Sequence, residues 1–229
     1  MNYTQFHGNT FLFINKDASE FPLVTNQDVD LTMYYQKLLL ESNKTHKTFE
    51  CTFFNKDESE AELCGNALFG LMKQEGFGEY MFKTKAGRFG AINTGKELRL
   101  GMKKADIDLD CDEQHFAMYK VNVGNCHVVC YEKEIYSKYL KAVMYDARHT
   151  DYSEEIKKLK FNLHSVIQKD TNTFEVRCFE RGVGETQACG SGAYAVGVAM
   201  MKHFNLDEVK IVMKGGEYTV KKDWLIVKI

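Results

Sequence analysis

The sequence predicts an α+β protein made of two similar halves, each a mixed or antiparallel sheet wrapped around a central helix. The first observation is a repeat: TFECTFFNKDESEAELCGNALFG around Cys64 aligns without a gap with TFEVRCFERGVGETQACGSGAYAV around Cys189, at a constant offset of 125 residues. The second is a shared order of patterns in both halves, which is typical of duplicated folds. The third is the alternation of apolar and polar residues in short segments, which indicates half-buried strands.

The first half is expected to contain the following elements in order. A Gly-Asn loop at 8–9 leads into a buried strand, and the apolar spacing of 29–43 favours an amphipathic helix that packs on one side of a sheet. Alternation predicts strands at 48–54 and 96–102. The apolar segment 65–76 after Cys64 predicts a buried central helix that stops at Gly76. A β-hairpin is expected from 81–85 and 88–92 around Lys85-Ala86-Gly87.

The second half repeats this order. A strand is expected at 116–123, a Gly-Asn loop and strand at 124–130, an amphipathic helix at 134–146 and a strand at 173–179. The segment 190–204 after Cys189 predicts the second central helix. A hairpin follows from 209–213 and 217–221, and a last strand from 223–229. We place the boundary in the polar stretch KKADIDLDCDEQ, which gives halves at 1–112 and 113–229.

Composition excludes several classes of function. The chain has 30 basic and 32 acidic residues, a net charge of −2 and no Lys/Arg-rich run, so nucleic acid and membrane surfaces are not expected as partners. No apolar run approaches the ~20 residues of a membrane span. The start MNYTQFHGNT lacks a secretory pattern, so we expect a cytoplasmic protein. Seven scattered cysteines without a CxxC pair predict reduced thiols and no metal site.

The repeated Cys-Gly pair at a helix start carries chemistry. A thiol there feels the positive end of the helix dipole, which is expected to lower its pKa. Free amides of the first turn can bind a carboxylate, and the small residues Gly65 and Gly190-Ser191-Gly192 let a ligand approach the backbone. A single such thiol is more often a buried core residue. Two in matching contexts predict opposed acid–base groups that invert an amino-acid Cα without a cofactor.

At these residues the chain resembles the diaminopimelate epimerase family. The stretch from Phe179 to Ala193 (FERGVGETQACGSGA) matches the family's second-half signature almost throughout. Leu63-Cys64-Gly65-Asn66-Ala67 resembles the first-half signature, and Gly124-Asn125-Cys126-His127 resembles its Gly-Asn-Pro-His segment, with a cysteine in place of the proline. Phe6-His7-Gly8-Asn9-Thr10-Phe11 resembles its opening segment.

The resemblance implies a site. Cys64 and Cys189 would be the two acid–base residues, and His127 and Glu180 would position the α-amino group and support proton movement. The α-carboxylate would be bound at the helix starts. At the far end of the substrate an asparagine pair and an arginine would hold the second amino-acid group. The implied binding residues are Asn9, Asn55, Gly65, Asn66, Asn125, Asn162, Arg181, Gly190 and Ser191. Asn55 and Asn162 match by spacing, nine residues before Cys64 and eighteen before Glu180.

The function implied is cofactor-independent epimerisation of LL-2,6-diaminopimelate to the meso form, in lysine and peptidoglycan precursor biosynthesis, by a homodimer. Three alternative functions stay open. The substrate could be another amino acid, Cys189 alone could serve a hydrolase or a thiol oxidoreductase with His127, or the fold could serve binding without catalysis. Arg181 could instead pair with Glu185, and a lone asparagine often caps a turn.

Overall fold

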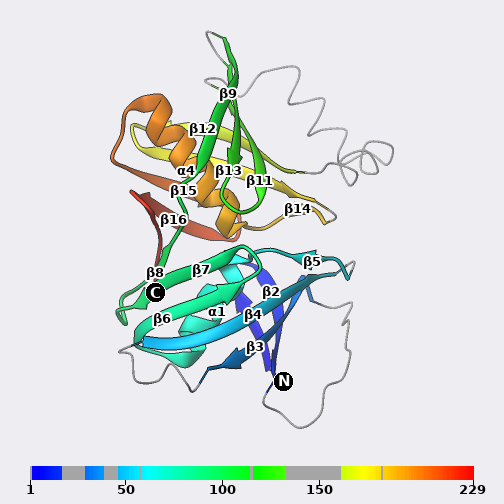
Figure 1. Cartoon of the computed structure of the whole chain (residues 1–229). Coiled ribbons are helices and arrows are strands. Elements are labelled where there is room, and N and C mark those ends of the chain that lie inside the picture. The colour runs from blue at the N-terminus through cyan, green and yellow to red at the C-terminus, as the bar shows by residue number, and fades with distance from the viewer. Residues whose placement is uncertain are drawn as a thin grey trace.

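The structure is a computed structural model that describes residues 2–16, 29–38, 46–56, 58–113, 116–132, 161–181 and 183–229. Within these residues it contains two helices and one continuous sheet of seventeen strands. Figure 1 shows the chain as two lobes, and in each lobe strands surround one helix. The predicted fold class is confirmed in this arrangement.

The first lobe contains eight strands and one helix. They are β1 (Asn2–Phe6), β2 (Asn9–Asn15), β3 (Leu31–Lys37), β4 (His46–Asn55), β5 (Glu60–Ala61), α1 (Gly65–Glu75), β6 (Gly78–Thr84), β7 (Gly87–Asn93) and β8 (Glu97–Gly101). The connecting strand β9 (Asp106–Glu113) follows. The second lobe contains β10 (Phe116–Asn122), β11 (Cys126–Glu132), β12 (Asn162–Asp170), β13 (Thr173–Glu180), β14 (Gly184–Thr186), α4 (Gly190–Phe204), β15 (Glu208–Met213), β16 (Gly216–Lys221) and β17 (Trp224–Lys228).

The two lobes share one strand topology. In the first, β2 is parallel to β3, β4 is parallel to β6, and the pairs β1–β2, β3–β4, β4–β5, β6–β7 and β7–β8 are antiparallel. In the second, β11 is parallel to β12, β13 is parallel to β15, and β10–β11, β12–β13, β13–β14, β15–β16 and β16–β17 are antiparallel. The sequence repeat therefore corresponds to the same set of strand pairs in each lobe.

The last strand of each lobe joins the lobes. β8 and β17 occupy equivalent places in the repeat and pair with each other in antiparallel register, from Trp224 opposite Gly101 to Lys228 opposite Glu97. The C-terminus consequently lies beside the first lobe (Figure 1). Buried apolar residues from both lobes form one continuous cluster. The boundary placed at 112/113 falls near the end of β9, which pairs with β10.

Both central helices are buried because they have almost no polar face. In α1 every residue from Gly65 to Met72 is buried. In α4 ten residues are buried, including Ala193, Val196 and Ala199. A helix that is apolar on all sides must be enclosed, and the curled sheet encloses each one. This enclosure holds the starts of α1 and α4 at fixed places in the interior.

The helix expected at 29–43 is wrong in its first part. Residues Leu31–Lys37 form β3, parallel to β2 and antiparallel to β4. Leu31, Met33 and Tyr35 point into the core, which is a period of two. The run of leucines at 38–40 produced the helical spacing in the sequence pattern. The helix expected at 134–146 lies outside the described residues.

Candidate active site

The starts of α1 and α4 meet at the interface between the lobes. Cys64 and Cys189 are the N-cap residues, and both have extended backbone, with φ/ψ of −129°/101° and −131°/114°. A Cβ built on Gly65 would lie 3.5 Å from the Cα of Gly190, and one built on Gly190 would lie 3.2 Å from the backbone nitrogen of Asn66. The contact at Gly65 is an ordinary van der Waals distance, whereas the shorter one at Gly190 favours glycine there.

Two asparagines join the lobes by hydrogen bonds beside the cysteines. Asn9 of the first lobe donates from Nδ2 to the Ala188 carbonyl at 2.7 Å. Asn125 of the second lobe donates to the Leu63 carbonyl at 3.4 Å. Each asparagine thus holds the residue before the other lobe's cysteine. Asn9 and Asn125 were expected to bond into the cavity; Asn125 lines the pocket, whereas Asn9 is not among its lining residues.

A second set of hydrogen bonds connects the starts of the two helices. Asn66 is buried in the first turn of α1 and donates to the Ala188 carbonyl at 3.2 Å. Its Oδ1 accepts a hydrogen bond from the Tyr218 hydroxyl at 2.6 Å. Sequence reasoning missed Tyr218, because β16 looked like an ordinary hairpin strand. Its partner is 152 positions away, so only the tertiary fold brings the two together.

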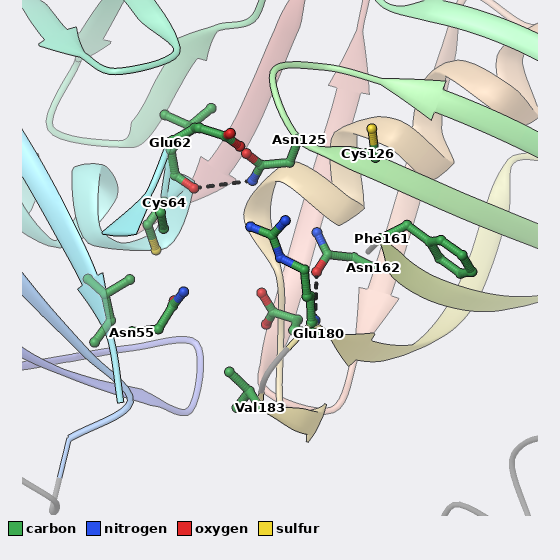
Figure 2. Close-up of a pocket in the computed structure, with 13 residues that line it drawn as sticks. Asn55, Glu62, Cys64, Asn125, Cys126, Phe161, Asn162, Glu180 and Val183 are labelled. Atoms are coloured by element: carbon green, nitrogen blue, oxygen red, sulfur yellow. Dashed lines mark hydrogen bonds between the residues drawn. The ribbon is translucent and has the colours of Figure 1, made fainter. Parts of the chain in front are cut away.

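A pocket opens between the lobes in front of Cys64. Residues of both lobes line it: Leu31, Asn55, Ala61, Glu62, Leu63 and Cys64 from the first, and Asn125, Cys126, Phe161, Asn162, Glu180, Arg181 and Val183 from the second. Figure 2 shows Asn55 and Cys64 on one side, with Asn125, Asn162 and Glu180 on the other. The pocket therefore collects six of the thirteen residues that the sequence nominated.

Glu180 links the two cysteines electrostatically. It lines the pocket and accepts a hydrogen bond from the Thr186 hydroxyl at 2.7 Å. Burial raises the pKa of its carboxyl group. The carboxylate in turn helps to raise the pKa of both Cys64 and Cys189. Cys189 is 5% exposed and lies behind the pocket surface rather than on it.

The expected lowering of the thiol pKa values is wrong for the unliganded protein. Burial raises the pKa of Cys64 to about 12, although the amides of Ala67 and Asn66 act in the opposite direction. Burial also raises the pKa of Cys189 well above its ordinary value, although the Gly192 N–H donates to its Sγ at 3.3 Å. The helix starts contribute as expected, but desolvation of a buried thiolate is the larger effect. Burial therefore favours the neutral form of both thiols.

His127 is buried against a second histidine. Its Nδ1 lies 2.8 Å from Nε2 of His164, and the two rings are 1% and 0% exposed. Burial lowers the pKa of both, that of His164 to about 3. His164 in turn packs on the first turn of α4, where a Cβ on Gly192 would lie 2.3 Å from its Cε1. His127 does not line the pocket, and sequence reasoning missed His164.

The three residues predicted for the distal end of the substrate, Asn55, Asn162 and Arg181, all line the pocket. Asn162 accepts a hydrogen bond from the backbone nitrogen of Arg181 at 2.9 Å. Asn55 donates to the Ser59 hydroxyl at 3.0 Å. The alternative of an ion pair between Arg181 and Glu185 is not what the structure has, because Glu185 pairs with Arg177 at 2.8 Å. Gly190 and Ser191 lie in the first turn of α4, with Ser191 Oγ 3.6 Å from Cys189 Sγ.

Two further properties concern the described part of the chain. None of its helices is long and apolar enough to cross a membrane. Among the same residues, no three metal-ligating side chains gather into a group that could hold an ion.

Comparisons with known proteins agree with this architecture. The family model for diaminopimelate epimerase matches residues 119–224. The diaminopimelate epimerase of Hydrogenobaculum sp. (strain Y04AAS1) is 28% identical over 241 residues, which cover 92% of this chain and 86% of that protein. The diaminopimelate epimerase of Bacteroides thetaiotaomicron is 24% identical over 246 residues, covering 96% and 90%.

Solved structures share the fold at low identity. A phenazine biosynthesis protein of the PhzF family from Bacillus anthracis has a TM-score of 0.70 at 13% identity, covering 99% of this chain and 95% of that one. A hydroxyproline epimerase from Agrobacterium vitis with bound trans-4-hydroxy-L-proline has a TM-score of 0.63 at 11% identity, covering 99% and 89%. The sequence relatives align over nearly the whole chain and the family model over residues 119–224, so this protein is similar in sequence to the diaminopimelate epimerases.

Proposed function

We propose that the protein is a two-base, cofactor-independent epimerase that converts LL-2,6-diaminopimelate to the meso form. Such an enzyme would act in the cytoplasm in lysine and peptidoglycan precursor biosynthesis, as a homodimer. The observation that carries the proposal is the meeting of two Cys-capped helix starts at Gly65 and Gly190. Two thiols in equivalent positions on opposite lobes suit removal of a proton from one face of Cα and its replacement on the other.

The residues divide the work as follows. The α-carboxylate binds the free amides at the starts of α1 and α4, where both dipoles favour negative charge. Glu180, which lines the pocket, positions the α-amino group, and the family resemblance assigns a supporting role to His127, which lies behind the pocket surface. Arg181, with Asn55 and Asn162, holds the distal carboxylate, because a guanidinium can bind it with two parallel hydrogen bonds. The substrate is an amino acid with a second carboxylate.

The proton transfer balances without a cofactor. One cysteine acts as a thiolate and takes the α-proton, and the electron pair moves into the carbanion-like centre. The opposite thiol gives its proton to the other face of Cα. At the end the two cysteines have exchanged protonation states, so the reverse reaction begins from the product complex. Because the pair must hold one proton between two buried sulfurs, it titrates as a unit.

The substrate also helps to form the thiolate. Burial keeps both thiols neutral in the free protein. An α-ammonium group brought beside them supplies the positive charge that favours ionisation of one thiol, whose proton passes to solvent before the ligand excludes water. Exclusion of water by the bound ligand strengthens this attraction.

The test is proton NMR of the purified protein with LL-diaminopimelate in D₂O and a reductant. We expect loss of the α-proton signal together with appearance of the meso isomer. Cys64→Ala and Cys189→Ala should each lower turnover by about 10³-fold or more, whereas Cys51→Ala, in the core of the first lobe, should leave it within a few-fold. Isomerisation that survives Cys64→Ala would contradict the two-base proposal and favour a single-cysteine enzyme.

A second candidate is a racemase or epimerase of another amino acid by the same chemistry. The structural similarity to a hydroxyproline epimerase supports it. A panel of L-amino acids in the same D₂O assay separates the two. Exchange of a monocarboxylic amino acid that is unaffected by Arg181→Gln would favour the second candidate.

A further inference from the structure

We infer that Glu62 and the side-chain oxygen of Asn125 form an ammonium-binding subsite that selects substrates with a second amino group. This inference rests on the proposed function, whose substrate carries an amino group at each end. Both residues line the pocket, and they come from different lobes. Neither the repeat nor the family resemblance had nominated Glu62.

One hydrogen bond orients the Asn125 amide. Its Nδ2 donates to the Leu63 carbonyl. Turning the amide over would set Oδ1 against that carbonyl oxygen, and two acceptors repel each other. Oδ1 therefore faces the other way, and it is buried without a hydrogen-bond partner in the described structure. A buried oxygen left unpaired is costly, which indicates that a ligand supplies its donor.

The Glu62 carboxylate is the matching acceptor. Figure 2 shows its side chain directed toward Asn125 across the upper edge of the pocket. The backbone around Glu62 is held, because its carbonyl accepts a hydrogen bond from the Ala86 N–H at 3.1 Å. Among the residues described, Glu62 has no ion-pair partner. Lys85 feels its charge, but the Lys85 ammonium is bonded to Glu60 at 2.8 Å.

Two acceptors that face each other call for a cation with several N–H donors. A primary ammonium group has three donors and no acceptor, so it can bond both oxygens at once. In the other amides of the pocket, Asn162 Oδ1 accepts from the Arg181 backbone N–H and Asn55 Nδ2 donates to Ser59. Asn162 Nδ2 therefore faces the distal carboxylate as a donor, and Asn55 Oδ1 is a further acceptor that lines the pocket. With the Arg181 guanidinium in the same pocket, Glu62 completes a pair of opposite charges that complements the two charged groups of a distal amino-acid end.

The experiment compares two substrates and two variants. LL-diaminopimelate and L-2-aminopimelate have the same carbon chain and both carboxylates, but the second lacks the distal amino group. Their α-proton exchange in D₂O and their equilibrium binding by calorimetry are measured for the wild type, Glu62→Gln and Glu60→Gln. Glu60→Gln is the matched control, because it removes a nearby carboxylate whose side chain is outside the pocket.

The subsite predicts a selective loss. Glu62→Gln should lower kcat/KM for LL-diaminopimelate by about tenfold or more and change that for L-2-aminopimelate by less than about twofold. Glu60→Gln should change neither. Equal losses on both substrates, or none on either, would overturn the subsite while the epimerase proposal stands. If the wild type exchanges neither substrate but binds LL-diaminopimelate more tightly, and Glu62→Gln removes that difference, the epimerase proposal fails and the subsite stands. Equal binding of the two compounds overturns the subsite.

Discussion

Tyr218 differs from its counterpart in the first lobe by one hydroxyl group. Gly87 and Gly216 are equivalent hairpin positions, so Phe89 and Tyr218 occupy the same place in β7 and β16. Only the second lobe has a hydroxyl there, and it bonds Asn66 at the start of α1. The two lobes are thus alike in backbone and different in polar chemistry beside the thiols.

Removing that hydroxyl should impair turnover. Tyr218→Phe leaves Asn66 Oδ1 buried without a donor, a loss of about 1–3 kcal/mol, and frees the amide that holds Ala188 before Cys189. We expect kcat to fall about tenfold with KM changed by less than about threefold, because the thiols lose alignment. Steady-state kinetics measure this. Tyr131→Phe is the control, since its hydroxyl bonds Gln168 away from the pocket at 3.4 Å. A change in KM alone would contradict the alignment argument.

The thiols also set a dependence on pH. Burial raises the pKa of Cys64 to about 12 and that of Cys189 above its ordinary value. Below these pKa values, each decrease of one pH unit lowers the thiolate population of the free enzyme about tenfold. We expect kcat/KM for α-proton exchange to rise from pH 6 to pH 9 without a plateau. A flat profile between pH 7 and 9 would mean that the free enzyme already holds a thiolate.

Single residues show where sequence reasoning stops. Cys64 could be predicted from the repeat, and Glu180, Arg181, Asn55 and Asn162 from the resemblance to a known family, the two asparagines by their spacing to its motifs. His164, Tyr218 and Glu62 could not. Their partners, His127, Asn66 and Asn125, lie on elements that only the tertiary fold brings beside them.

At the scale of elements, the start of α4 is held by a close contact with β12. Gly192 lies in its first turn, and a Cβ there would be 2.3 Å from the His164 ring, which is buried and bonded to His127. The His164 ring is 0% exposed, so it can shift only by displacing its neighbours. Gly192→Ala should therefore cost about 1–3 kcal/mol of unfolding free energy, as overpacking of a core does. Urea denaturation measures it.

Gly90→Ala is the control for this contact, because a Cβ on Gly90 in β7 would meet nothing within 4 Å. It should leave the unfolding free energy within about 0.5 kcal/mol. If both alanines cost the same, the steric account of α4 is wrong and the loss belongs to glycine replacement in general. Restoration of stability to Gly192→Ala by His164→Ala would support the contact directly.

Elements were predictable where one pattern dominated. The central helices followed from long apolar segments after Cys-Gly, and the hairpins from glycine turns between alternating strands. The helix prediction was wrong for the segment from Leu31 to Lys37 because two periods overlapped. The segment itself has the alternation of a strand, whereas the leucine run after it has helical spacing. Pairing with β2 on one side and β4 on the other decided the outcome, and such non-local pairing is absent from a local pattern.

On the scale of the whole molecule, buried histidines should make the fold sensitive to acid. Burial lowers the pKa of His7 to about 4, that of His164 to about 3 and that of His127 as well. The unfolded chain takes up these protons near pH 6.5 and the folded chain does not. The contribution of these histidines to the free energy of unfolding is therefore fully present above about pH 6.5, and it is lost as the pH drops toward 3. The raised pKa of Glu180 acts in the opposite direction, but it is one group against three.

The slope of stability against pH measures this balance. Each histidine that stays neutral in the fold contributes up to about 1.4 kcal/mol per pH unit. Urea denaturation at pH 7.5, 6 and 5 should show a falling unfolding free energy, and His164→Gln should reduce the slope whatever its effect at pH 7.5. A slope that is unchanged in this variant would mean that His164 is protonated in the folded protein.

The same whole-molecule view predicts how the lobes unfold. The chain has one tryptophan, Trp224, and it lies in β17 opposite Gly101 of β8, where the sheet passes from one lobe to the other. The apolar residues of both lobes form one cluster, and the asparagine cross-links beside Cys64 and Cys189 tie the lobes again. Exposing an interface of this kind costs so much free energy that one lobe does not open alone.

We expect tryptophan fluorescence and far-ultraviolet circular dichroism to give coincident urea transitions, as in a two-state protein. Fluorescence that changes at lower urea than the circular dichroism would show that the junction parts first, and that residues 1–112 and 113–229 are separate folding domains.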